Sequence, residues 1–241
     1  MESLGIGFIQ TLLKEQHWET QANAAHLLGN LCISPEIRET ILQQMDAVES
    51  VLSFLDSEKV ILKRFALRSL SNLSLSEKGQ KKIVEWKGTD KIASILDKLD
   101  HSDAQVVASA CMVVVNLSPN VEINQFFMDR SLKDLLSLLS SPNFALQLYS
   151  LRAIFNLDRF QGTSFLRSFF LVFFLNLPSE SNRARLVQAG IQNSLKPLTN
   201  SKSNDLKLVA EAFLSRIEKG IASKKDPSFS GDSTNIDRDF K

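Results

Sequence analysis

The sequence predicts an all-α fold made of stacked helical repeats. Three observations predict it: an Asn-Leu pair that recurs at nearly constant intervals, apolar residues at helical spacing before each pair, and a composition poor in glycine and proline. The 241 residues include 9 Gly and 6 Pro, and 44% are hydrophobic. Such a chain folds, and it favours helices. Two cysteines far apart in sequence are too few for a zinc site or a disulfide framework.

The recurring pair defines the repeat. It begins at residues 30, 72, 116 and 156, so the intervals are 42, 44 and 40 residues, which is typical of repeats built from two or three helices. Six positions before each Asn stands a small residue, and five and two positions before it stand mainly larger apolar residues, which is helical spacing. A last copy has Arg216-Ile217 in place of Asn-Leu. We therefore expect four to five equivalent helices.

Between these helices, each repeat contains a polar or charged segment followed by a leucine-rich one. The polar segment predicts a short helix and the leucine-rich segment a second helix, so each repeat has three. Turn signals such as Ser34-Pro35 and Lys87-Gly88 separate them. The paired segments are 37–41 with 48–55, 81–85 with 92–96, and 124–128 with 132–139.

These residues resemble the armadillo repeat family over residues 4–219. The family pattern of Ala-Ala-x-x-Leu-x-Asn-Leu, a polar turn, Asn-Arg-x-x-Ile/Val-x-x-Gly and Ile-x-x-Leu-x-x-Leu-Leu-x-Ser matches residues 24–31 and 182–198. The resemblance implies a right-handed α-solenoid (superhelix) of about four to five armadillo repeats over residues 1–219. The polar stretch 220–241 is predicted to be a disordered tail. The turn glycine seen as Gly88 and Gly190 is replaced by Asp46 and Arg130 in two copies.

The period breaks after Asn156-Leu157. The next Asn-Leu pair follows 20 residues later, and removing residues 158–177 restores the phase. The segment holds six of the 16 phenylalanines, and its end, 170–177, matches 150–157 position by position, so either copy can serve as the repeat helix. We interpret 158–177 as an insertion. It is a variant segment from alternative processing of the message, a surface helix covering the solenoid, or a patch that docks to a partner or a membrane.

The Asn-Leu helices carry the candidate binding site, because residues four apart on them share one face along a predicted concave groove. The Asn amides either hydrogen-bond the backbone of an extended peptide, or cap their own helix or bond the neighbouring repeat. In the armadillo family the importin-alpha branch binds peptide through this Asn, so the resemblance favours the first interpretation. The predicted peptide-binding residues are Asn30, Asn72, Asn116, Asn156, His26, Arg64, Arg68, Met112 and Arg152.

The residue four positions before each Asn indicates the kind of peptide. Importin-alpha proteins carry Trp there to pack a basic peptide, whereas this chain has His26, Arg68, Met112 and Arg152. With Arg64 one turn earlier, the groove is mildly basic and resembles the branch that binds acidic or phosphorylated tails. The alternative is that these arginines form a solvated helix face.

The sequence thus predicts a non-catalytic scaffold or adaptor for a protein partner. We find no catalytic motif and no Cys/His pair with metal spacing, so we expect no enzyme activity, cofactor or metal. A net charge of +1 argues against nucleic acid, and the apolar run 165–177 is too short for a membrane span. No secretory signal is apparent, which predicts the cytoplasm or nucleus. Two alternatives are a substrate-recognition subunit of a ubiquitin ligase or similar complex, and a membrane-associated armadillo protein using the Phe-rich segment.

Overall fold

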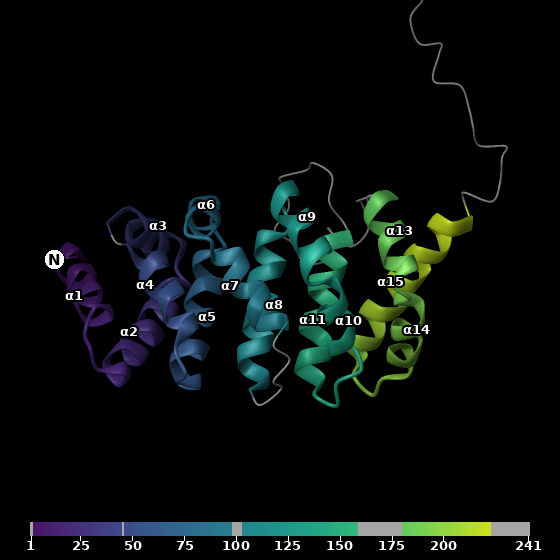
Figure 1. The fold of residues 1–241 in the computed structure, drawn as a ribbon, viewed down its shortest axis with the longest axis horizontal. Coiled ribbons are helices and arrows are strands. Elements are labelled where there is room, and N and C mark those ends of the chain that lie inside the picture. Colours follow the sequence, from purple (N-terminus) through teal and green to yellow (C-terminus); the bar gives the residue numbers. More distant parts are fainter. Residues whose placement is uncertain (1, 45, 98–102, 159–179, 223–241) are drawn as a thin grey trace, which may run out of the picture. The chain divides into compact units, whose positions relative to one another are not determined.

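A computed structural model describes residues 2–44, 46–97, 103–158 and 180–222 of the chain. Across these residues the regular structure is entirely helical, which confirms the all-α prediction (Figure 1). Most of the predicted insertion and nearly all of the predicted tail lie outside the described residues. The chain divides into two compact units, residues 1–189 and residues 190–241.

Three-helix repeats recur along the first unit. A pair of helices is followed by three complete repeats and by the first helix of another. A 3-10 helix, η1, extends α4. The elements are α1 (Glu2–Leu13), α2 (Trp18–Leu31), α3 (Pro35–Gln44), α4 (Ala47–Ser53), η1 (Phe54–Asp56), α5 (Val60–Leu73), α6 (Glu77–Glu85), α7 (Gly88–Asp97), α8 (Ala104–Leu117), α9 (Val121–Arg130), α10 (Leu132–Leu138), α11 (Phe144–Asp158) and α13 (Glu180–Gln188).

The second unit contains one helix pair. The helix α14 (Ile191–Leu195) continues into the 3-10 helix η2 (Lys196–Asn200), and α15 (Asn204–Ala222) packs against both. Because α15 ends at Ala222, residues 220–222 belong to this helix, and the predicted tail boundary at residue 220 is wrong by three residues.

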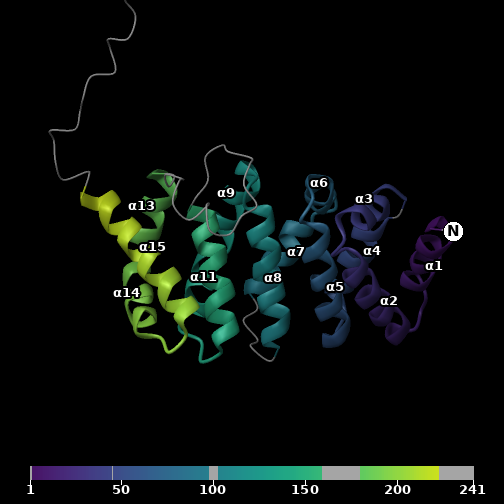
Figure 2. The ribbon, with the colours of Figure 1, turned by 180° about the vertical axis from the view of Figure 1, so that it is seen from behind.

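The four Asn-Leu helices α2, α5, α8 and α11 lie side by side in chain order (Figures 1 and 2). Positions in them are counted from the Asn, which is position 0. The small residues at position −6 let neighbouring helices approach closely, and the side chains at −5 and −2 are fully buried in all four helices. The spacing prediction is therefore confirmed. The residues at −5 and −2 are Ala25 and Leu28, Leu67 and Leu70, Cys111 and Val114, and Leu151 and Ile154.

A polar side chain from the following first helix bonds the end of each Asn-Leu helix up to α8. The last carbonyl groups of a helix lack partners inside it, so such side chains complete the hydrogen bonding. In each case the acceptor carbonyl lies six residues before the donor. The bonds run from Arg38 to Cys32 (3.0 Å), from Gln80 to Ser74 (3.0 Å) and from Asn124 to Ser118 (3.2 Å).

The two predicted turn glycines serve different purposes. Gly190 has a φ of 78°, the left-handed conformation that glycine adopts without strain. At the other turn the left-handed residue is Lys87, with a φ of 55°. Gly88 is instead required for close approach, because a Cβ there would lie within 3 Å of atoms of Ile83 and Leu52.

The structure resolves which of the two similar segments fills the fourth repeat position. Residues 150–157 belong to α11, which packs against α8 and α10. The competing segment 170–177 lies outside the described residues.

Candidate functional site

The Asn residues at position 0 form a regular series of bonds between neighbouring repeats. Each side-chain amide donates from Nδ2 to the backbone carbonyl at position −1 of the preceding Asn-Leu helix. Asn116 also donates to Oγ of Ser74, at 3.0 Å. The backbone acceptors are Gly29 for Asn72 (2.7 Å), Ser71 for Asn116 (2.8 Å) and Val115 for Asn156 (3.4 Å).

This series gives the Asn residues a role in joining repeats, which is the second of the two interpretations that the sequence allowed. The bonds use the amide nitrogen, and the Oδ1 atoms of Asn72 and Asn116 take no part in them. An amide offers two N–H donors as well as this acceptor, so joining repeats and binding a peptide are compatible. Peptide binding by these residues stays a prediction.

The residues at position −4 lie next to this series on the same helix faces. His26 is stacked on Phe65, with ring centroids 4.4 Å apart and an interplanar angle of 8°. Arg68 is exposed, and its Nη2 donates to Oδ1 of Asn30 at 3.0 Å. We call the solvent-accessible side of α2, α5, α8 and α11 that carries positions −4 and 0 the third-helix surface.

Farther along the third-helix surface, Met112 and Arg152 are both half-buried. The guanidinium carbon of Arg152 lies 5.7 Å from the ring centroid of Tyr149, a distance at which a cation is attracted to the aromatic face. The structure thus brings the predicted residues at positions −4 and 0 together along one surface. His26, Arg68 and Arg152 each have a neighbour on the same or the adjacent helix that restricts their orientation.

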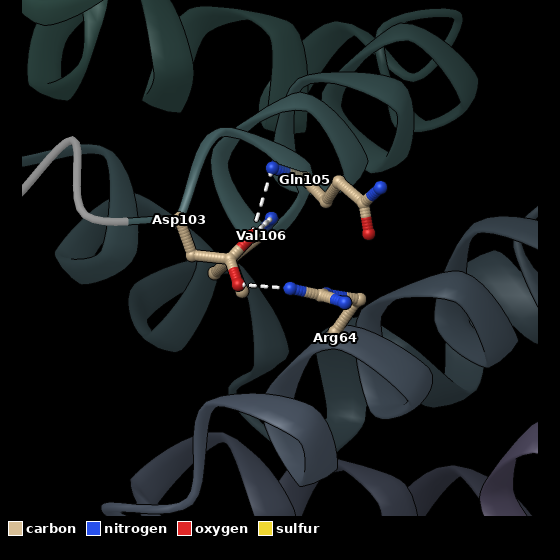
Figure 3. Close-up of polar contacts among 4 residues, drawn as sticks. All are labelled: Arg64, Asp103, Gln105 and Val106. Atoms are coloured by element: carbon tan, nitrogen blue, oxygen red, sulfur yellow. Dashed lines mark hydrogen bonds and ion pairs between the residues drawn. The ribbon is translucent and has the colours of Figure 1, made fainter.

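Arg64 differs from the other predicted residues, because it reaches across to the next repeat. Its Nη2 lies 2.5 Å from Oδ2 of Asp103, the residue that precedes α8 (Figure 3). The other carboxylate oxygen accepts the backbone N–H groups of Gln105 at 2.9 Å and Val106 at 3.1 Å, so Asp103 is the N-cap of α8. The charge of Arg64 is therefore compensated within the protein.

The pKa of Asp103 reflects this arrangement. Its partial burial raises the pKa, but the hydrogen bond from Arg64 and those from the backbone of α8 outweigh burial and hold the pKa below its usual value. Asp103 is thus a stable anion that anchors Arg64, and the arginines at position −4 contribute the basic character of the surface.

Two aromatic neighbours were not predicted from the sequence. Phe65 and Tyr149 both stand at position −7, one turn before position −4, and they pack against His26 and Arg152. An aromatic residue at the same repeat position in two of four copies is a signal that the sequence contained. Asp103 carried no such signal, because its pairing with Arg64 depends on how α5 and α8 pack.

The two cysteine thiols are unsuited to nucleophilic chemistry. Burial raises the pKa of Cys111 to about 12. The same effect raises the pKa of Cys32 to about 12, although nearby Arg38 opposes the shift. The reactive form of cysteine is the thiolate, which is negligible at neutral pH when the pKa is this high. Both residues are core residues, as the sequence predicted for them.

The described residues also bear on metal binding and on the membrane. Among them, no three His, Cys, Asp or Glu side chains gather in a way that would hold a metal ion. None of the helices in the described ranges combines the length and the apolar character needed to cross a membrane.

Comparison with solved structures identifies similar folds. An engineered protein superposes with a TM-score of 0.72 at 20% identity, covering 88% of this chain and 80% of that one. A designed armadillo repeat protein in complex with the peptide (KR)4 has a TM-score of 0.71 at 17% identity, covering 87% of this chain and 80% of that one. Computationally designed armadillo repeat proteins for modular peptide recognition match with a TM-score of 0.71, at 17% identity, over 86% of this chain and 80% of that one.

Neither a scan against protein-family models nor a search of curated proteins finds a match. At identities of 17 to 20% the structural likeness concerns the fold alone. It agrees with the three-helix repeat, with the Asn-Leu period and with the side-by-side packing of α2, α5, α8 and α11. The chain therefore has an armadillo-like repeat fold and is an all-α solenoid.

Proposed function

We propose that the protein is a non-catalytic scaffold that binds an extended, acidic or phosphorylated segment of a protein partner along the third-helix surface. The observation that carries this proposal is the position of Arg68 and Arg152. Both stand at position −4 of their helices, next to the Asn residues at position 0. The surface thus offers positive charge beside amide groups.

The spacing of the two arginines suits an extended chain. Their helices, α5 and α11, are separated by α8, and packed helices lie 8–10 Å apart, so the arginines are roughly 20 Å apart. An extended chain rises about 3.3 Å per residue, so roughly six residues span this distance. Two acidic residues about six positions apart would therefore each meet one arginine, with Met112 contacting the segment between them.

The charge of this chain points to a different peptide from that of its designed neighbour. That neighbour holds (KR)4, a peptide of alternating Lys and Arg. In this chain a basic peptide would meet like charges at Arg68 and Arg152. Guanidinium groups form bidentate bonds with carboxylate or phosphate, which favours an acidic segment.

The test compares two probe peptides, (Asp-Glu)4 and (Lys-Arg)4, by fluorescence anisotropy with the full chain at low salt. We expect the acidic peptide to bind more tightly, and its affinity to fall as salt rises. The double substitution Arg68→Glu with Arg152→Glu should weaken acidic-peptide binding by at least about tenfold, because two attractive pairs become repulsive.

A matched control separates local from overall charge. Lys81 on α6 and Lys133 on α10 are exposed residues away from the third-helix surface. The double substitution Lys81→Glu with Lys133→Glu changes the net charge equally, and we expect it to weaken binding by less than about threefold. Equal loss in both variants, or binding that survives the arginine reversals, would place the binding site elsewhere.

A further inference from the structure

The outer face of the first helix pair exposes apolar positions that are buried in the later repeats. At position −3, Leu27 of α2 is 44% exposed, whereas the equivalent residues of α5, α8 and α11 are fully buried. At position +1, Leu31 is half-buried, and its three equivalents are again fully buried. The buried equivalents are Ser69, Val113 and Ala153 at −3, and Leu73, Leu117 and Leu157 at +1. Positions −3 and +1 therefore belong to the side of an Asn-Leu helix that stacks on the preceding repeat.

Helix α1 contributes two more apolar residues to this face. Phe8, 22 positions before Asn30, is 63% exposed. Its equivalent in α10 is Asp134, which contacts Asp97 of α7 in the preceding repeat. Leu12 is half-buried, whereas its equivalents Phe54 and Leu138 are buried. Phe8 and Leu12 thus occupy positions that contact a preceding repeat elsewhere in the chain.

Two glycines in α1 support the presence of a contact. A Cβ added at Gly5 or Gly7 would meet no atom within 4 Å, so packing within the chain does not require glycine at either position. Glycine inside a helix is less stable than alanine, and its common purpose is to let another backbone approach closely. Gly5 lies one helical turn before Phe8, on the same side of α1.

We propose that this first-repeat face, formed by Gly5, Phe8, Leu12, Leu27 and Leu31, is where two copies of the chain associate, like face to like face. Exposed apolar clusters of this kind mark interaction sites in folded proteins. The face has the residue positions that stack helices elsewhere in the chain, so helices are the elements that fit it. A second copy presents such helices in the form of its own α1 and α2.

The chemistry of α15 argues against a head-to-tail contact. At position −5, where the other Asn-Leu helices bury Ala, Leu or Cys, α15 has the exposed residue Glu211. Lys207, one turn earlier, lies 3.8 Å from it. Stacking α15 of one copy on Leu27 of another would remove these charges from water, which is costly. A contact between like faces avoids this cost and closes a two-fold dimer, the commonest form of oligomer.

The first experiment measures the mass of the full chain by sedimentation equilibrium over a range of concentrations. We expect a reversible dimer. Phe8→Glu and Leu27→Glu, tested separately, should each raise its dissociation constant at least tenfold while the circular dichroism spectrum stays unchanged. Val121→Glu on α9 is the control, because Val121 is an apolar residue that is 61% exposed away from this face.

The second experiment tests the symmetry directly. Asn23 is exposed one turn before Leu27, and the native Cys32 and Cys111 are buried. In an Asn23→Cys variant, mild oxidation should link the two copies through a disulfide between the introduced thiols, and a Ser137→Cys variant on α10 should link far less. A chain that stays monomeric, a dimer unaffected by both glutamate substitutions, or equal cross-linking in the two cysteine variants would overturn the proposal.

Discussion

Helices α2 and α15 hold the same place in the repeat but differ at the positions that join one repeat to the next. In α2 the exposed joining position is apolar, with Leu27 at −3. In α15 the joining position −5 carries Glu211, which is exposed and lies near Lys207. The buried state of a joining position comes from its neighbour, not from its own helix. The residue type at an uncovered position therefore indicates whether water or another protein surface covers it.

The strongest test of this comparison uses two leucines at position +1. Leu117 is fully buried and Leu31 is half-buried. Leu117→Ala should lower the free energy of unfolding by about 2–5 kcal/mol, because it leaves a cavity between repeats. Leu31→Ala should cost less than about 1 kcal/mol at low protein concentration, because its side chain is already partly in water. Urea unfolding followed by circular dichroism measures both, and equal losses would contradict the comparison.

Two glycines provide the next largest effect. Gly88→Ala should destabilise the fold by about 1–3 kcal/mol, because the new methyl group would collide with Ile83 and Leu52. Gly5→Ala should instead stabilise α1 by up to about 1 kcal/mol in the monomer, since the site is open. It should also weaken the proposed dimer. Thermal unfolding of the two variants at low concentration checks the opposite signs.

The repeat itself was predictable from the sequence because its signal is local and redundant. The Asn-Leu pair, the small residue at −6 and the apolar residues at −5 and −2 recur in phase, so this pattern by itself locates α2, α5, α8 and α11. The side-by-side packing follows from that pattern, since one helix face alone cannot bury these residues.

The chemistry of the site was less predictable, because it depends on contacts between repeats. The sequence placed Asn72 and Arg64 on one helix face but did not distinguish a bond to a peptide from a bond to Gly29 or Asp103. The positive φ of Lys87 was also missed, because glycine was expected to hold that conformation. Side-chain partners 38 to 45 residues away are set by helix packing, which single-sequence patterns do not encode.

A smaller effect comes from the start of each Asn-Leu helix. His17, the residue before α2, makes no side-chain capping bond, whereas Asp103 caps α8 and pairs with Arg64. The lowered pKa of Asp103 means that its contribution to stability is present above the unfolded value, near 3.9, and is lost as the pH falls through the lower folded pKa. Because Arg64 is 37% exposed, solvent screening limits the contribution to about 1 kcal/mol.

The substitution Asp103→Asn isolates this contribution, since asparagine still caps a helix but carries no charge. The variant should be less stable than the wild type at neutral pH, and the difference should shrink in acid. Melting temperatures at pH 7 and pH 3 measure it. A difference that stays constant with pH would show that the ion pair contributes nothing.

The smallest expected effect concerns Asp134, the equivalent of Phe8. Burial and the neighbouring carboxylate of Asp97 raise the pKa of Asp134. A carboxylate with a raised pKa destabilises the fold while it is ionised, and this cost disappears as the pH falls through that pKa. Asp134→Asn should therefore raise stability at pH 7 by a few tenths of a kcal/mol, with the gain fading in acid. A lower melting temperature at pH 7 would show that Asp134 stabilises this contact.

The most direct test of the proposed function is hydrogen–deuterium exchange of the full chain with and without the acidic probe (Asp-Glu)4. The third-helix surface is the central claim, so bound peptide should slow exchange in α5, α8 and α11, and the Arg68→Glu, Arg152→Glu variant should lose this protection. Protection confined to α3, α6 and α9, or peptide binding that leaves α5, α8 and α11 unchanged, would contradict it.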